Sequence, residues 1–336
     1  MMRIVRWMAC FRADVMIIAP LIVRPKYGTT IIHPNIYFFI KTFKLSKVIP
    51  ITFGMASQFL KLGSTITGAT NLCFKTRTKQ FKVHFGINPG TCNILHNRLY
   101  REFGVRVSHL HLLWSLYFFC MHPKVKVIHK LFGVDVKTFR KHTRKIIYYF
   151  KHLEVASNFV CNMLNMFSWE FQIKFSHKLK SLDGTDFRIK EPRPFSTKWW
   201  SFKFNGPGLR HEIALEVESG HIVWAYGGFP CGRYPDLKIA RRRFVKLLKP
   251  NERTIADKGY RFDNHFYHCK NGRRNNKWIK KILARHENAN QRIKSFDCLS
   301  ETFRHDLSLH HVFFHAVANI VQTGVENGEK LPDVSC

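Results

Sequence analysis

Acidic residues are scarce in this chain. Its 336 residues include 22 Asp and Glu against 55 Lys and Arg, which gives a formal net charge of +33. No acidic residue occurs between Val15 and Arg101. This excess of positive charge goes beyond what solubility requires. It indicates a polyanionic partner, with nucleic acid as the first candidate and an anionic membrane surface as the second.

Long apolar runs and paired cysteines are also absent. The run Val15–Val23 has nine residues and contains Pro20, whereas a membrane-spanning helix needs about 20 residues. The nine cysteines stand singly, without a CxxC pair, which indicates reduced thiols rather than a metal site or a disulfide framework. Hydrophobic residues make up 45% and aromatic residues 14% of the chain. The chain can therefore bury a core, and global disorder is excluded.

Sequence patterns divide the chain into five segments. Residues 1–80 show no clear helical periodicity and are left as an unassigned, poorly ordered basic region. We predict a helical DNA-binding domain at 81–155, a linker at 156–175, an α/β domain at 176–325 and a tail at 326–336. The α/β assignment rests on the order strand, hairpin, helix, strand, helix in the second half.

A helix-turn-helix is predicted within the helical domain. A short helix through Leu131 leads into a turn at Phe132–Asp135 that contains Gly133, and a second helix follows. This spacing is typical of motifs whose second helix enters the major groove. The second helix carries the residues predicted to contact DNA: Lys137, Arg140, Lys141, Arg144 and Lys145. The alternative is a solvated basic face on a structural helix.

Three carboxylates stand out in the second half. Asp183 is predicted at the end of a strand beside Gly184, Asp257 ends the strand-like run TIAD, and Glu287 lies within a helix. Loops at strand ends leave side chains free to meet a metal. If they converge, the three acids can hold two Mg²⁺ or Mn²⁺ ions for phosphodiester displacement. The alternative is that both aspartates are turn formers and Glu287 is a surface charge.

Other polar residues give weaker signals. Asp186 is expected to be a turn former and Asp236 a helix N-cap. His311 and His315 have the i, i+4 spacing of zinc ligands, but without Cys or acidic partners nearby in sequence we expect ordinary histidines. Two basic clusters are candidates for phosphate contacts: Arg241–Arg243 and Lys270–Lys277.

Several ordered motifs together carry a resemblance to a known family. The strings SLDGTDFRIKEPRPF, KWWSFKFNGPGLRHEIALE, FPCGRYPDLKIAR, IADKGYRFD and ARHENANQRIKSF resemble DDE-superfamily transposases, in the branch related to Harbinger elements and similar bacterial insertion-sequence transposases. The resemblance implies a ribonuclease H-like α/β catalytic domain after a helix-turn-helix domain. It also implies that Asp183, Asp257 and Glu287 form the catalytic metal triad. Residues 1–80 have no counterpart in it.

The expected function follows from that resemblance. It implies a metal-dependent DNA endonuclease and strand transferase that acts on transposon ends and uses two Mg²⁺ or Mn²⁺ ions. Its expected partners are the double-stranded DNA of transposon ends and of the target, with a homodimer as a further expectation and no membrane partner. The expected location is the nucleus of a eukaryote or otherwise the cytoplasm. The alternative is a domesticated or decayed DNA-binding protein that keeps the fold without catalysis.

Overall fold

The computed structural model describes residues 53–153, 179–248, 252–268 and 276–334. Every described residue belongs to one compact unit, Ile51–Cys336. Most of the predicted basic region, the whole predicted linker and the loop Lys270–Lys277 up to its last two residues lie outside the described ranges.

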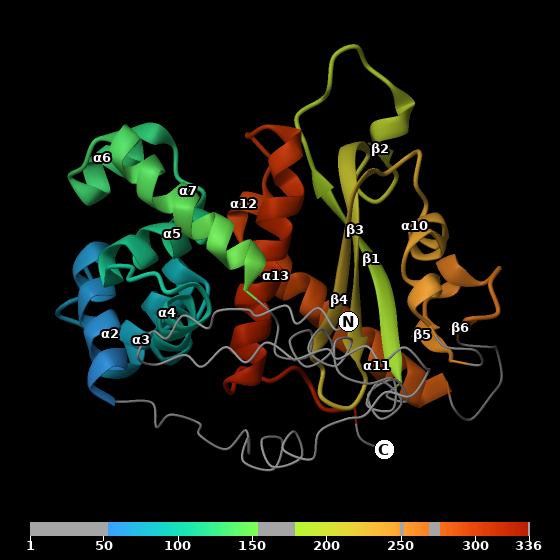
Figure 1. Ribbon diagram of the computed structural model, residues 1–336, viewed down its shortest axis with the longest axis horizontal. Helices are drawn as coiled ribbons and strands as arrows, with labels where there is room; N and C mark the ends of the chain where they lie inside the picture. The colour runs from blue at the N-terminus through green and yellow to red at the C-terminus, as the bar shows by residue number, and fades with distance from the viewer. Residues whose placement is uncertain (1–52, 154–178, 249–251, 269–275, 335–336) are drawn as a thin grey trace, which may run out of the picture. The chain divides into compact units, whose positions relative to one another are not determined.

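Six helices form the first half of the described chain (Figure 1): α2 Phe53–Thr67, α3 Phe74–Phe85, α4 Pro89–Phe103, α5 His109–Met121, α6 Val125–Phe132 and α7 Val136–His152. No structure was predicted before residue 81, so α2 and α3 are additions to the sequence-based assignment. Both helices are held by aromatic burial, since Phe59 of α2 and Phe81 and Phe85 of α3 are at most 1% exposed. These helices therefore belong to the core of the helical part.

Helix ends in this part follow the predicted capping pattern. The Asn88 side chain accepts a hydrogen bond from the Thr91 amide at 2.7 Å, and the Ser108 hydroxyl accepts one from the His111 amide at 3.2 Å. Both bonds satisfy amide groups that have no partner within the helix. Gly133 ends α6 with φ of 64°, a left-handed conformation that glycine adopts without strain. The identification of α6 and α7 as a DNA-reading helix-turn-helix stays a prediction.

The second half is built on a mixed sheet. Its strands are β1 Lys180–Arg188, β2 Trp200–Ser201, β3 Gly206–Glu216, β4 Ile222–Pro230, β5 Thr254–Ala256 and β6 Phe266–Tyr267. β3 pairs antiparallel with β1, β2 and β4, while β1, β5 and β6 are parallel neighbours. The β3–β4 hairpin confirms the predicted turn at Ser219–Gly220. The mixed α/β architecture agrees with the predicted class.

Helices lie on both faces of this sheet (Figure 1): α10 Asp236–Arg242 on one side, and α11 Asn276–Lys294, α12 Asp297–Ser300 and α13 His310–Glu326 on the other. Alternation along the strands sorts the side chains between the two layers. Leu182 of β1 packs with Ala240 of α10, whereas His211 of β3 stacks on Phe314 of α13 with ring centroids 4.0 Å apart. One sheet thus presents two chemically distinct faces.

The helical part and the sheet share one hydrophobic core. Phe119 of α5 and Phe313 of α13 make an edge contact with ring centroids 5.4 Å apart, and the Asn319 amide of α13 donates to the Phe150 carbonyl of α7 at 2.9 Å. Burial of these side chains therefore joins α5 and α7 to α13. Within the described ranges, no helix is both long enough and apolar enough to cross a membrane.

Candidate functional site

Asp183 lies within β1, not at a strand end. The strand continues to Arg188, so the prediction of a strand-end position was wrong; the ladder with β3 continues as far as Arg188↔Gly208. One Asp183 carboxylate oxygen accepts a hydrogen bond from the Gly184 amide at 2.8 Å, and the other accepts one from the Asn290 side-chain amide of α11 at 2.9 Å. The carboxyl group is thus held between β1 and α11.

Asp257 directly follows β5 and confirms the predicted strand-end position. Asp257 is the N-cap of the short 3-10 helix η3, Lys258–Tyr260. Its carboxylate accepts a hydrogen bond from the Gly259 amide at 2.7 Å. β5 runs parallel to β1, with Ala256 opposite Leu182. Asp257 and Asp183 therefore each follow one residue of this pair. Neighbouring strands of a sheet are about 4.8 Å apart. The fold itself places these two carboxylates side by side.

The surroundings of Asp183 disfavour its negative charge. Burial raises the pKa of Asp183 to about 7, and the neighbouring charges of Asp257 and Asp236 act in the same direction. The charge of Lys203 and the Gly184 amide oppose this shift. The Lys203 ammonium is held beside the site by a 2.7 Å hydrogen bond to the Gly184 carbonyl. Asp183 therefore lacks full cationic compensation from the protein.

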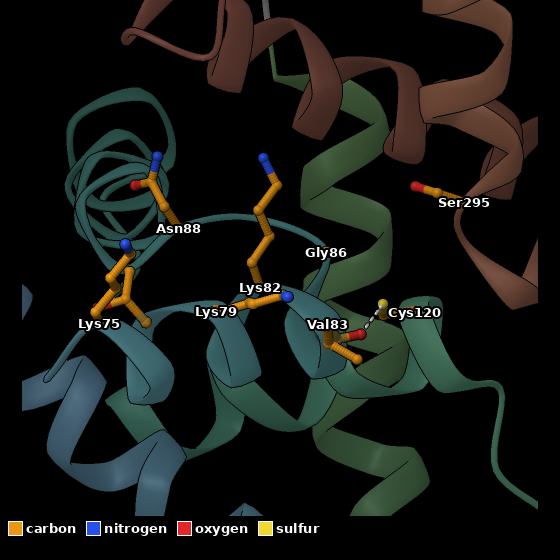
Figure 2. Close-up of a pocket in the computed structure, with 9 residues that line it drawn as sticks. Lys75, Lys79, Lys82, Val83, Gly86, Asn88, Cys120 and Ser295 are labelled. Atoms are coloured by element: carbon orange, nitrogen blue, oxygen red, sulfur yellow. Dashed lines mark hydrogen bonds between the residues drawn. The ribbon is translucent and has the colours of Figure 1, made fainter. Parts of the chain in front are cut away.

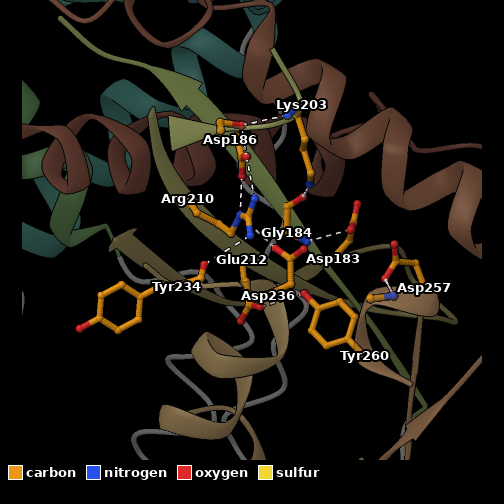
Figure 3. A network of polar contacts seen from close by, with 12 residues as sticks. Asp183, Gly184, Asp186, Lys203, Arg210, Glu212, Tyr234, Asp236, Asp257 and Tyr260 are labelled. Atoms are coloured by element: carbon orange, nitrogen blue, oxygen red, sulfur yellow. Dashed lines mark hydrogen bonds and ion pairs between the residues drawn. The ribbon is translucent and has the colours of Figure 1, made fainter. Parts of the chain in front are cut away.

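Gly184 is required by a close approach of Asp236. A Cβ atom at position 184 would lie 2.0 Å from an Asp236 carboxylate oxygen, far inside contact distance. Asp236 was predicted to cap α10; this was wrong, because Pro235 holds the N-cap position without a side-chain bond. The Asp236 carboxylate instead points at the sheet, 3.2 Å from Arg210 Nε (Figure 3). The DGT motif thus makes room for a second carboxylate.

Asp186, which is on the same strand as Asp183, forms an ion pair with Arg210 of β3 (Figure 3). Arg210 Nε donates to one Asp186 oxygen at 2.6 Å and a terminal guanidinium nitrogen donates to the other at 2.8 Å. The Ser201 hydroxyl donates a third bond at 2.5 Å. Burial works to raise the pKa of Asp186, but these donors prevail and lower it. Asp186 is in mid-strand, so its predicted role as a turn former was wrong.

A buried acid that was not predicted from the sequence lies in β3. Glu212 is fully buried opposite Gly184, and one of its oxygens accepts a 2.8 Å hydrogen bond from the Tyr260 hydroxyl of η3. Its other oxygen has no hydrogen-bond partner. Burial raises the pKa of Glu212 well above its ordinary value, which favours the neutral carboxyl group. In the string HEIALEVE it looks like one outward-facing residue of an alternating strand, and no local signal marks it as buried.

Glu287 lies within α11 as predicted, but its side chain is exposed. The α11 residue that contacts Asp183 is Asn290, one turn later and 2% exposed. Lys294 follows on the same face. Burial lowers the pKa of Lys294, while the charges of Glu287 and Asp183 act against that shift. The negative charges of both acids therefore favour the charged form of the same ammonium group.

The donor set near Asp183 consists of oxygen atoms, which suits a hard cation such as Mg²⁺. Asp183 and Asp257 lie on neighbouring strands, and the side-chain oxygen of buried Asn290 has no hydrogen-bond partner. Over the described parts of the chain, however, no three His, Cys, Asp or Glu side chains come close enough together to hold a metal ion. This also applies to His311 and His315. Asp183 and Asp257 are therefore suited to bind a cation together, whereas Glu287 does not lie close to them.

A comparison with known protein families gives a match in the second half of the chain. Residues 182–324 match the family model described as DDE superfamily endonuclease. The match runs from β1 into α13 and includes Asp183, Asp257 and Glu287. It supports a transposase-like nuclease domain, as the sequence motifs implied. No curated protein and no solved structure matches the chain.

The predicted DNA-contacting residues of α7 share one solvent-exposed face: Lys137, Arg140, Lys141, Arg144 and Lys145. The opposite face is buried through Phe139, Ile146 and Phe150. The Asp135 carboxylate caps this helix by accepting a 2.8 Å bond from the Lys137 amide. The basic face is therefore displayed by a helix that is anchored at its start and along its apolar side.

Proposed function

We propose that the chain is a metal-dependent DNA endonuclease and strand transferase of the transposase type, with a ribonuclease H-like catalytic domain. The family match across the segment that contains Asp183 and Asp257 carries the proposal. The sheet supports it, since its order of β4, β3, β1, β5 and β6 places both aspartates on adjacent parallel strands. Affiliation with the Harbinger-like branch remains part of the proposal.

The chain's own residues would prepare the reaction in distinct ways. Asp183 and Asp257 would hold Mg²⁺ or Mn²⁺, with Asn290 fixing the orientation of the Asp183 carboxylate through its 2.9 Å bond. Bound ions of this kind activate an attacking water or 3′-hydroxyl and stabilise the leaving oxygen. Lys203, whose ammonium lies beside Asp183 on the Gly184 carbonyl, would bind a phosphate oxygen of the DNA. Glu287 is proposed as the third acid of the triad.

The basic face of α7 is proposed to hold DNA through Lys137, Arg140, Lys141, Arg144 and Lys145. Five exposed cations on one helical face, with the opposite face buried, suit a helix lying against a phosphate backbone or in a major groove. Double-stranded transposon ends and target DNA are the proposed partners. A homodimer and a nuclear or cytoplasmic location are part of the same proposal.

Nicking of supercoiled plasmid DNA in Mn²⁺ or Mg²⁺ tests the proposal. Asp257→Asn should reduce the nicking rate by about 100-fold or more, because it removes a metal-binding carboxylate. The matched control is Asp306→Asn: Asp306 is an exposed cap outside the site, and Asn caps equally well. Nicking by Asp257→Asn protein at the wild-type rate would contradict the proposal.

A second function, DNA binding without cleavage, is favoured by one observation. Glu287 is exposed and does not join the two aspartates in a metal-binding group. Comparing Glu287→Gln with Asp257→Asn separates the two functions. If both variants lose nicking, the triad is complete during catalysis. If the wild-type protein binds DNA but does not nick it in either metal, the non-catalytic function is correct.

A further inference from the structure

A hollow beside α3 lies outside the proposed catalytic site and away from the basic face of α7. It has a volume of about 570 Å³ and is lined by residues of α3, α5 and the segments before α4 and after α11 (Figure 2). Lys75, Lys79 and Lys82 line it together with Asn88 and Ser295. The hollow therefore carries three cationic side chains over a lining surface that is mostly apolar.

The three lysines form a stripe on one face of α3. Their spacing of i, i+4 and i+7 places them in line along the helix, while Phe81 and Phe85 are buried on a neighbouring face. From Lys75 to Lys82 the helix rises about 10 Å, which corresponds to about three nucleotide steps of one DNA strand. All three side chains are exposed. The stripe thus has the length and the spacing to follow a short piece of phosphodiester backbone.

Little negative charge balances this stripe. Lys82 forms an ion pair with Glu329, whose other oxygen accepts bonds from the Asn88 backbone and side chain at 3.2 and 2.9 Å. Lys75 and Lys79 form no ion pair with any residue in the described ranges. Burial raises the pKa of the Cys120 thiol, at the floor of the hollow, to about 12, so this group adds no negative charge. Two cations remain for a ligand.

The hollow begins where the catalytic helix ends. Ser295 follows Lys294, the last residue of α11, and α11 carries the Asn290 that contacts Asp183. Five residues of helix span about 7.5 Å. The hollow therefore adjoins the C-terminal end of the helix that contacts Asp183.

We propose that the hollow lined by Lys75, Lys79 and Lys82 is a second DNA-binding site, which holds the phosphodiester backbone of the DNA beside the catalytic site. Binding at this site does not depend on the DNA sequence, because lysines contact phosphates as point charges and phosphate contacts do not distinguish bases. It rests on the proposed function only in that DNA is the polyanion. It predicts that α3, whose first seven residues have no counterpart in the resemblance, contributes to DNA affinity.

The salt dependence of DNA binding tests this site. Binding of a fluorescein-labelled 30-base-pair duplex to the full chain would be measured by anisotropy in EDTA, between 50 and 200 mM salt. Removing one lysine–phosphate interaction reduces the magnitude of the slope of log Kobs against log salt by about 0.9. Lys75→Gln/Lys79→Gln should therefore reduce it by about 1.8. Both side chains are exposed, so the fold should persist, as thermal melting would verify.

The matched control is Lys61→Gln/Lys246→Gln, which removes the same charge at exposed positions that do not line the hollow. Its slope should stay within about 0.5 of the wild-type slope. An equal fall in both variants would mean diffuse electrostatic attraction and would overturn the proposal. An unchanged slope in the Lys75/Lys79 variant would also overturn it. If that variant instead lost binding to polyglutamate, the hollow would belong to an acidic protein partner.

The outcomes separate this site from the proposed function. Metal is absent from the assay, so a defect in catalysis cannot imitate a defect in the hollow. If the wild-type chain binds no DNA at all, both the proposed function and the hollow are contradicted. If it binds with the same slope in all variants while Asp257→Asn abolishes nicking, only the hollow fails.

Discussion

Asp183 and Asp186 lie three residues apart on opposite faces of one strand, in opposite electrostatic surroundings. Asp186 faces Arg210 and Ser201, which donate three hydrogen bonds to it and lower its pKa. Asp183 faces α11, receives one amide bond from Asn290, and has its pKa raised to about 7 by burial and by nearby acids. On one face of the sheet, the protein's own donors satisfy the Asp186 carboxylate. On the other face, the Asp183 carboxylate is left able to bind a cation.

The contrast between Asp186 and Asp183 distinguishes a charge that stabilises the fold from a charge that is available to a ligand. A carboxylate that the protein neutralises internally can stabilise the fold but has nothing left to offer a metal. A carboxylate crowded by Asp257 and Asp236 costs folding free energy when no cation is bound, and such uncompensated charge is typical of functional sites. Because the two residues share a strand, the contrast arises from the neighbouring elements and not from the local sequence.

The largest stability effect should follow from breaking the completed pair. Asp186→Asn should lower the free energy of unfolding by about 3 kcal/mol, because it leaves the Arg210 guanidinium buried with only Asp236 nearby. Urea unfolding in EDTA measures this. Asp186→Leu/Arg210→Met removes both charges and should recover most of the loss. Equal destabilisation in the single and double variants would show that packing, not charge, makes Asp186 important.

Much of the fold could be read from local signals in the sequence. The caps at Asn88 and Ser108, the turn at Gly133 and the β3–β4 hairpin each depend on a few adjacent residues, and the structure confirms them. Local chemistry is enough where a helix end or a turn is set by its own side chains.

The candidate site was only partly predictable, because it is made by contacts between distant segments. Asp257 stood out at the end of its strand, but nothing local shows that Asp236 would lie against Gly184 instead of capping its own helix. The hydrogen-bond partner of Glu212 is Tyr260, 48 residues away. Helices α2 and α3 were missed because their order comes from packing Phe59 and Phe81 into a common core, with weak amphipathic periodicity of their own.

Acid should remove the stability that depends on the buried, neutral His310 and spare the Asp186 pair. His310 of α13 is buried against His211 of β3, with ring nitrogens 3.0 Å apart. Burial and the nearby His311 lower the pKa of His310 to about 3. Between pH 6.5 and 3 the unfolded chain therefore binds a proton that the folded protein does not. The contribution of His310 to stability is complete above pH 6.5 and falls as the pH decreases, by about 2 kcal/mol at pH 5, whereas the raised pKa of Asp183 acts in the opposite direction.

The loss of stability between pH 7 and pH 5 is the quantity to compare, by urea unfolding at both values. In His310→Gln protein this loss should be smaller than in the wild type by about 2 kcal/mol, whatever the variant's stability at pH 7. His129→Gln is the control, since His129 is exposed on α6 and should leave the loss unchanged. If both variants lost as much stability between pH 7 and pH 5 as the wild type, groups other than His310 would cause the acid sensitivity.

The smallest effect should appear at Asp183 and have the opposite sign to that at Asp186. Asp183→Asn removes a carboxylate that is crowded by Asp257 and Asp236 while keeping an oxygen for the Asn290 amide. In EDTA at pH 8 the variant should be more stable than the wild type by about 1 kcal/mol, because like charges no longer repel within a buried site. The wild type should gain thermal stability in 10 mM Mg²⁺, since a cation that binds only the folded state stabilises it, and the variant should gain little. A variant that is destabilised in EDTA and still stabilised by Mg²⁺ would mean that Asp183, like Asp186, is a structural charge.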